Sequence, residues 1–399
     1  MPNEGPVRLV VTGGGTGGHL YPGLAIARAV VRRDPLVEPV FVGARRGIER
    51  EVLPTTEFRH VLLDLHPLYR QRPWENWRTV AGGVRAWRAL GALFGRERPR
   101  AVLGTGGYAA GAALAYAVAH GMPAMLQEAD SFPGVTTRLV ARRAAEVFLG
   151  FPEAAERLAP GPRTHVEAFG NPIEPPPPRE ARPSPAEARR AWGFEPDAFV
   201  VLVFGGSQGA RALNEAVAEW ARGGLPDGVS LIWATGKAQH EPYAALDGAE
   251  GGRVRVVPYL APIAGAYAAA DLAVTRAGAM TIAELCAWGL PSVLVPLPTS
   301  AADHQARNAR ALAAAGASVH LPQAELSAAR LAEVVRALRA DQAAADGMRR
   351  AALARGRPDA AARIAERVVN VVRGRAVPGV VPASGRAGVG LRTGGSRAS

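Results

Sequence analysis

A chain of 399 residues, 48% apolar and 21% charged, has a globular composition and is long enough for two domains. Its 47 basic and 35 acidic residues give a net charge of +12, nearly all of it arginine, which favours anionic partners, although biased genome composition gives the same excess. No apolar run reaches the length of a membrane-spanning helix, and the single cysteine excludes an internal disulfide framework and fits a reducing cytoplasm.

The first predicted strand, residues 8–12, leads into a glycine-rich loop at Gly13–Gly18. The loop satisfies G-x-G-x-x-G, which alone is a weak signal, and His19 stands where a Walker phosphate loop has its lysine. A nicotinamide site is disfavoured, because the second predicted strand, residues 39–42, lacks the acidic residue that binds a ribose. The remaining interpretation is a glycine loop that faces an anion, with His19 beside it.

Residues 60–95 combine tryptophans with arginines, and Trp77, Val84 and Trp87 share one face at helical spacing. One interpretation is an amphipathic helix packed on its own sheet. The other is an exposed patch, including Trp74, that inserts shallowly among anionic lipid headgroups. The sequence leaves both open.

Two further predicted strands in the first half end in polar or glycine-rich turns. Residues 100–103 precede a turn that ends at Tyr108, and residues 123–127 precede Glu128 and Asp130. Residues 175–185 then contain six prolines, which can continue neither a helix nor a central strand. We therefore predict a stiff linker and a domain boundary there.

The second half repeats the order strand, glycine turn, helix. A buried strand at residues 199–204 is followed by Gly205–Gly209, whose Ser207 and backbone suit a diphosphate at a helix N-terminus. The repetition predicts two similar α/β halves, each with a parallel sheet.

A strand at residues 272–275 stops at a small-residue turn that opens a helix ending near Gly289. Thr281 and Glu284 have capping-box spacing, and Glu284 projects away from the apolar face of the helix. Helix N-termini beyond strand ends bind phosphates, and a carboxylate one turn further in suits sugar hydroxyls. The alternative is that Glu284 only caps its helix and Asp303 only starts the next one.

Four turn motifs, GGGTGGH, GGY, GGSQGA and GAMTIAE, occur in this order and are followed by Asp303-His304-Gln305 with Asn308. Together they resemble the MurG family of glycosyltransferases over about residues 7–373. The resemblance implies a GT-B type α/β fold, with two Rossmann-like domains whose parallel sheets face a central cleft. It implies inverting transfer of N-acetylglucosamine from UDP-N-acetylglucosamine to a lipid-linked muramyl pentapeptide, the step from lipid I to lipid II in peptidoglycan synthesis.

The resemblance also implies the site residues. Uracil would contact the Leu260 backbone, the ribose would contact Glu284, and the sugar hydroxyls would contact Gln305. His19 is the first candidate for the general base, because the pKa of histidine suits neutral pH. The donor-side residues are Thr16, Gly17, Gly18, Asp130, Glu174, Ser207, Leu260, Ala279, Met280, Thr281, Ile282, Ala283, Glu284 and Gln305. The acceptor-side residues are Gly14, Gly15, Thr16, His19 and Tyr108.

The chain departs from the family at two donor-side positions. The family usually has an asparagine where this chain has Asp130, which can accept but not donate a hydrogen bond when ionised. It usually has an arginine, reaching the nucleotide, where this chain has Glu174.

The predicted domains are 1–170 for the acceptor and membrane side, 171–191 for the linker, 192–355 for the UDP-sugar side, 356–373 for a crossover helix and 374–399 for a disordered basic tail. We expect neither metal nor cofactor, no nucleic-acid partner, and a peripheral position on the cytoplasmic face of the inner membrane, through the region of Trp74, Trp77 and Trp87. A UDP-N-acetylglucosamine 2-epimerase of the same fold stays open as the alternative.

Overall fold

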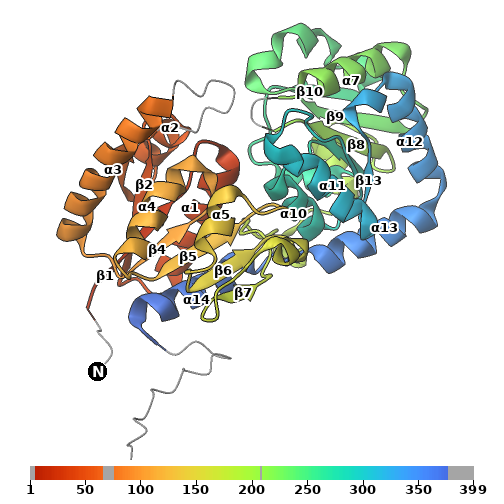
Figure 1. The fold of residues 1–399 in the computed structure, drawn as a ribbon. Helices are drawn as coiled ribbons and strands as arrows, with labels where there is room; N and C mark the ends of the chain where they lie inside the picture. The colour runs from red at the N-terminus through yellow and green to blue at the C-terminus, as the bar shows by residue number, and fades with distance from the viewer. Residues whose placement is uncertain (1–4, 66–75, 207–208, 376–399) are drawn as a thin grey trace, which may run out of the picture.

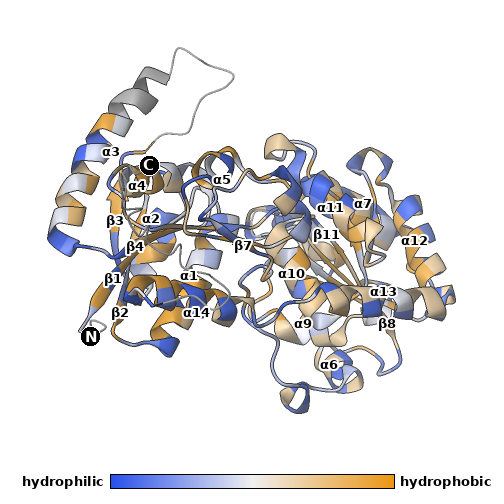
Figure 2. Cartoon of the chain, turned by 60° about the horizontal axis from the view of Figure 1, so that its bottom comes forward, coloured by the Kyte–Doolittle hydropathy of each residue, from blue (hydrophilic) through white to orange (hydrophobic). Residues whose placement is uncertain are grey.

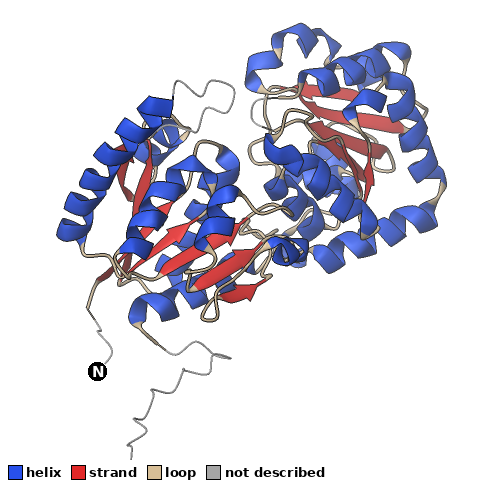
Figure 3. Cartoon of the chain, in the orientation of Figure 1, coloured by secondary structure: helices blue, strands red, loops and turns tan. Residues whose placement is uncertain are grey.

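The computed structural model describes residues 5–65, 76–206 and 209–375, with the side chains of 76–81 left aside. The described chain forms two α/β lobes, each built on its own sheet and covered by helices on both faces (Figure 1, Figure 3). Among the described residues, none of the helices has the length and apolarity needed to cross a bilayer.

The first lobe contains a seven-stranded sheet in the order β3-β2-β1-β4-β5-β6-β7, parallel throughout. Alternate residues of its central strand point to opposite faces, so Leu9 and Val11 pack beneath one helical layer and Val10 beneath the other. Its strands are β1 (Val7–Thr12), β2 (Val37–Ala44), β3 (Arg59–Leu63), β4 (Ala101–Gly104), β5 (Ala124–Glu128), β6 (Glu146–Leu149) and β7 (His165–Glu167).

Its longer helices are α1 (Gly17–Arg33), α3 (Asn76–Glu97) and α4 (Gly107–Ala119), and the shorter ones are α2 (Glu49–Val52) and α5 (Val135–Val140). Helix α1 covers one face of the sheet, and α3 and α4 cover the other. Helix α1 begins five residues before the predicted start at Pro22, because Gly17 and Gly18 already form its first turn and carry no apolar pattern.

The second lobe contains a six-stranded parallel sheet in the order β10-β9-β8-β11-β12-β13. Its strands are β8 (Phe199–Phe204), β9 (Val229–Ala234), β10 (Val254–Val257), β11 (Leu272–Thr275), β12 (Ser292–Leu294) and β13 (Ser318–His320). Its helices are α6 (Pro185–Ala191), α7 (Arg211–Gly223), α8 (Ala249–Gly252), α9 (Ala264–Ala269), α10 (Ala279–Trp288), α11 (His304–Ala314), α12 (Ala328–Ala340) and α13 (Gln342–Arg355). The sequence had placed residues 185–191 in the linker, but they form α6, whose N-cap Ser184 completes a capping box with Glu187.

The strand order makes each lobe a doubly wound fold with one switch point. The order reverses between β1 and β4 in the first lobe and between β8 and β11 in the second. In open parallel sheets, ligands bind in the crevice outside the strand ends at this point. The turns after β1, β4, β8 and β11, each of which contains glycine, all lie at these two positions, as expected for a GT-B type fold.

The last helix returns to the first lobe. Helix α14 (Ala360–Arg373) packs beside α1 under the first sheet, with its apolar face against the strands (Figure 2). Arg367 Nη2 donates to both carboxylate oxygens of the buried Glu146 of β6, at 2.9 and 3.0 Å. Arg373 forms an ion pair with Asp34 at 2.8 Å. Of the predicted tail, residues 376–399 lie outside the described residues.

Candidate active site

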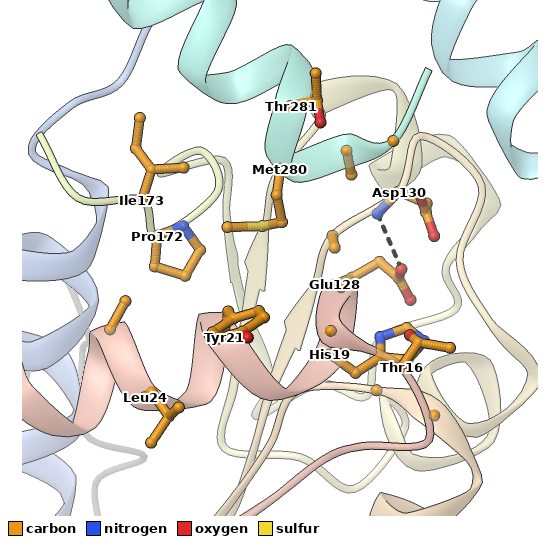
Figure 4. Close-up of a pocket in the computed structure, with 18 of the residues that line it drawn as sticks. Thr16, His19, Tyr21, Leu24, Glu128, Asp130, Pro172, Ile173, Met280 and Thr281 are labelled. Atoms are coloured by element: carbon orange, nitrogen blue, oxygen red, sulfur yellow. Dashed lines mark hydrogen bonds between the residues drawn. The ribbon is translucent and has the colours of Figure 1, made fainter. Parts of the chain in front are cut away.

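A cleft of about 2900 Å³ separates the two lobes. It is lined by the loops after β1, β4 and β5 from the first lobe and after β8, β11 and β12 from the second. Figure 4 shows His19 on α1, with Thr16 just before the helix, on the opposite side of this space from Met280 and Thr281 on α10. The two helix N-termini therefore point into one cavity from opposite lobes.

The amides of the first glycine loop are not all available to a ligand. The Gly14 N–H donates to the Gly106 carbonyl at 3.3 Å, and the Gly15 N–H donates to the Glu49 carboxylate at 2.9 Å. Helix α1 has no side-chain cap at Thr16, so its first amides, those of Gly17 and Gly18, lack an intrahelical partner. The Gly17 and Gly18 amides at the start of α1 are therefore the ones that this loop leaves without a partner among the described residues, and free amides at a helix N-terminus suit an anion.

His19 is the third residue of α1. Its carbonyl accepts a 2.7 Å hydrogen bond from the Thr105 hydroxyl of the loop after β4. Burial lowers the pKa of His19 below its usual value, and the neighbouring Asp130 carboxylate opposes that shift. The lowered pKa favours the neutral imidazole, which is the form that can accept a proton.

Asp130 is held between the two lobes. Asn308, which is fully buried in the second turn of α11, donates to the Asp130 carboxylate at 2.8 Å and accepts from the Ser131 N–H at 2.9 Å. On its own side, the loop is shaped by Glu128, which accepts from the Asp130 N–H at 3.2 Å (Figure 4) and from the Thr137 hydroxyl at 2.6 Å. Burial raises the pKa of Glu128.

Helix α10 begins at Ala279, with Gly278 as its N-cap and no side-chain cap. The predicted capping box is therefore wrong, because Thr281 lies inside the first turn and its hydroxyl does not cap the helix. As a result, the first amides of α10 remain free for an anion in the cleft. The helix ends as predicted at Gly289, in the left-handed conformation (φ 66°).

Glu284 faces the cleft one turn beyond these amides. Its carboxylate accepts a 2.7 Å hydrogen bond from the Tyr267 hydroxyl on α9. Burial raises the pKa of Glu284, Tyr267 opposes that shift, and the charge of Glu174 adds to it. Glu284 is therefore not a mere helix cap, since its side chain is held away from the helix end.

Arg276, between β11 and α10, provides positive charge on the second-lobe side of the cleft. Its guanidinium donates to the Val295 and Pro296 carbonyls, both at 3.1 Å, and to Gln323 at 2.7 Å. Burial lowers the pKa of Arg276. The arginine lines the cleft with no carboxylate in ion-pair range among the described residues, so its charge is not neutralised locally.

The structure brings most of the predicted site residues together. The cleft is lined by Gly15, Thr16, Gly17, Gly18, His19, Tyr108, Asp130, Glu174, Ala279, Met280, Thr281, Glu284 and Gln305. Four others do not line it. Gly14 is buried beneath its loop, Leu260 packs on the second-lobe core, and Ile282 and Ala283 face a small separate cavity beside Phe151. Ser207 lies outside the described residues.

Sequence reasoning missed the residues that hold the site in shape. Tyr267, Glu49 and Asn308 contact predicted site residues, yet each belongs to a different element from the residue it supports. Of the three, only Asn308 was already named, as the last residue of the motif that begins at Asp303, and its contact with Asp130 was not predicted.

Comparison with known proteins agrees with this geometry. Residues 9–149 match the glycosyltransferase family 28 N-terminal domain and residues 200–364 its C-terminal domain. The chain is 39% identical over 377 residues to the UDP-N-acetylglucosamine--N-acetylmuramyl-(pentapeptide) pyrophosphoryl-undecaprenol N-acetylglucosamine transferase of Moorella thermoacetica, covering 92% of this chain and 99% of that protein.

Two solved structures are also similar. The crystal structure of Acinetobacter baumannii MurG superimposes with a TM-score of 0.71 at 25% identity, covering 92% of this chain and 99% of that one. A UDP-GlcNAc 2-epimerase from Neisseria meningitidis bound to UDP-GlcNAc has a TM-score of 0.62 at 14% identity, covering 92% and 100%. The second likeness concerns the fold alone.

Proposed function

The chain belongs to glycosyltransferase family 28 and, within it, to the MurG enzymes, and from that premise we propose how its cleft transfers N-acetylglucosamine from UDP-N-acetylglucosamine to a lipid-linked muramyl pentapeptide. The observation that carries the proposal is the opposition of two uncapped helix N-termini, those of α1 and α10, across one cleft. Each suits one diphosphate, which the donor and the acceptor both contain.

In this proposal the donor occupies the second lobe. Its diphosphate accepts hydrogen bonds from the first amides of α10, its ribose binds Glu284, and its sugar reaches Gln305 and Asp130. The acceptor diphosphate lies at the first amides of α1, near Tyr108.

The reaction is a single displacement at the anomeric carbon. The C4 hydroxyl oxygen of the muramyl sugar forms the new bond to C1, and the bond from C1 to the UDP oxygen breaks, leaving the electron pair on UDP. His19 takes the hydroxyl proton, a role worth about 10² to 10⁴ in rate. The amides of α10 and the Arg276 charge stabilise the departing diphosphate.

Release of UDP from UDP-N-acetylglucosamine with a lipid-linked muramyl-peptide acceptor in detergent tests the proposal. We expect release that depends on the acceptor and persists with EDTA. Acceptor-independent formation of UDP-N-acetylmannosamine would favour the epimerase instead. No acceptor-dependent release above background would refute the transferase.

We also propose that the enzyme lies peripherally on the cytoplasmic face of the inner membrane and serves cell-wall synthesis, and through it cell shape and division. Val84 and Trp87 on α3 are 52% and 41% exposed beside Arg85 and Arg88, which supports a lipid-facing patch. Trp74 lies outside the described residues, and the side chain of Trp77 is not described. Replacing Trp87 by Ser should weaken sedimentation with anionic vesicles, and unchanged binding would count against the patch.

A further inference from the structure

A buried carboxylate lies directly beneath the first glycine loop. Glu49 is the first residue of the short helix α2 and has no solvent exposure. Within the described parts of the chain, no basic side chain forms an ion pair with it. A buried carboxyl group without a basic partner needs hydrogen-bond donors that are fixed in place.

Two main-chain amides supply these donors. The Gly15 N–H donates to Glu49 Oε2 at 2.9 Å, and the Ala44 N–H donates to Oε1 at 3.0 Å. Gly15 follows β1 and Ala44 ends β2, so one carboxylate joins the loops of two neighbouring strands. The contact leaves no room for side chains around it, because a Cβ at Gly14 or Gly47 would collide with this carboxylate.

This arrangement determines which amides the loop offers to a ligand. Gly15 has a φ of 89°, a conformation that L side chains rarely adopt, and its N–H is turned inward to Glu49. The chain then leaves the loop at Thr16 and begins α1, so the Gly17 and Gly18 amides and the His19 side chain take their direction from the fixed Gly15.

We propose that Glu49 is a positioning residue for the acceptor half of the site: its carboxylate fixes the Gly14–Gly15 backbone so that the start of α1 and His19 face the acceptor. The inference rests on the proposed transferase function. It requires a carboxylate, because both oxygens accept from N–H groups, whereas the NH₂ group of a glutamine would face one of those donors.

The test compares Glu49→Gln with Glu97→Gln. Glu97 is a matched control, since it is also buried in the first lobe but pairs with Arg8 at 3.2 Å and Arg59 at 2.8 Å and does not line the cleft. Small misplacement of reacting groups costs up to about 100-fold in rate. We expect Glu49→Gln to lower kcat/KM for the lipid-linked acceptor about 10- to 100-fold and to change the donor KM less than about twofold.

Glu97→Gln is expected to lower the Tm and leave both KM values unchanged. A second measurement needs no activity: exchange of the Gly15 amide with solvent should be slow in the wild type and faster in Glu49→Gln. If Glu49→Gln does not fold, Glu49→Asp, which draws the carboxylate back by one methylene, should show the same acceptor-only defect.

The possible failures are distinguishable. A wild-type enzyme that releases no UDP with the acceptor would refute the proposed function. If the wild type is active, three results for Glu49→Gln would overturn the positioning role. They are an unchanged kcat/KM for the acceptor, an equal loss of donor and acceptor affinity, and a Gly15 amide that still exchanges slowly.

Discussion

The Tyr267 hydroxyl donates a 2.7 Å hydrogen bond to the Glu284 carboxylate, which joins α9 to α10 at the donor side of the cleft. Tyr267 is itself buried, and its ring packs near Trp288 at the end of α10, with ring centroids 5.6 Å apart. The tyrosine is therefore fixed before any ligand arrives. It leaves Glu284 one defined orientation in which to meet the ribose.

Replacing Tyr267 by Phe should raise the KM for UDP-N-acetylglucosamine about tenfold and change kcat little. A hydrogen bond to a charged group contributes about 1.5–3 kcal/mol, and its loss also raises the pKa of Glu284, so that less of the carboxylate is ionised. Initial rates at varied donor concentration measure the effect. Tyr243→Phe, in the same lobe but outside the cleft lining, is the control, and a Tyr267→Phe enzyme with wild-type donor KM would refute the role.

Replacing Asp130 by Asn, the usual family residue, should shift the acid limb of the pH profile of kcat/KM to lower pH. Asp130 raises the pKa of His19 against the effect of burial, so removing its charge lowers that pKa further. A base must be neutral to act, and a lower pKa keeps it neutral in more acidic solution. An asparagine oxygen can still accept from Asn308, so the contact between the lobes should persist.

The same shift has a consequence for stability. His19 is harder to protonate in the folded than in the unfolded chain, so its contribution to stability is present above its unfolded pKa of about 6.5 and is lost as pH falls below it. Asp130→Asn should therefore be slightly more sensitive to acid than the wild type. An acid limb unchanged by Asp130→Asn would show that another group is the base.

Replacing Glu174 by Gln should lower the donor KM about two- to fivefold at low salt. Glu174 is exposed at the cleft edge, and its negative charge raises the pKa of Glu284 and repels an anionic donor. Exposed charge pairs contribute only about 0–1 kcal/mol and are screened by salt, so the gain should vanish near 1 M salt. A donor KM that does not respond at any ionic strength would remove Glu174 from the donor site.

The two-lobed fold was predictable because its signals are local. Several buried strands are short apolar runs followed directly by glycine, as at Phe199–Phe204, where predicted and observed bounds coincide. Many of the cleft-facing residues lie in or beside turns that follow strands, but their roles came from the family resemblance, since spacing alone left Glu284 open between a ligand contact and a helix cap. The starts of helices were harder to predict, as at Gly17 and Gly278, because a glycine there gives neither an apolar pattern nor a polar cap in the sequence.

The supporting contacts were not predictable from one sequence. Glu49 and Gly15 are separated by 34 residues, and Asp130 and Asn308 by 178, so only the assembled lobes reveal them. Gly14 illustrates this: the ligand contact that its motif implies stays a prediction, whereas the structure shows its N–H donating to the Gly106 carbonyl and Glu49 occupying the space where a side chain would lie. A motif identifies a loop but not which of its amides is free.

Replacing Arg367 by Met should destabilise the protein by about 3–5 kcal/mol, because it leaves the buried Glu146 carboxylate without its cation. Burial already raises the pKa of Glu146, and Arg367 opposes that shift. The single substitution Arg367→Met therefore leaves the free-energy cost of burying the Glu146 charge without compensation. Adding Glu146→Gln to Arg367→Met removes that charge and should recover much of the loss in Tm. A double variant no more stable than Arg367→Met would mean that Arg367 stabilises the return of α14 through its packing on the first sheet rather than through its charge.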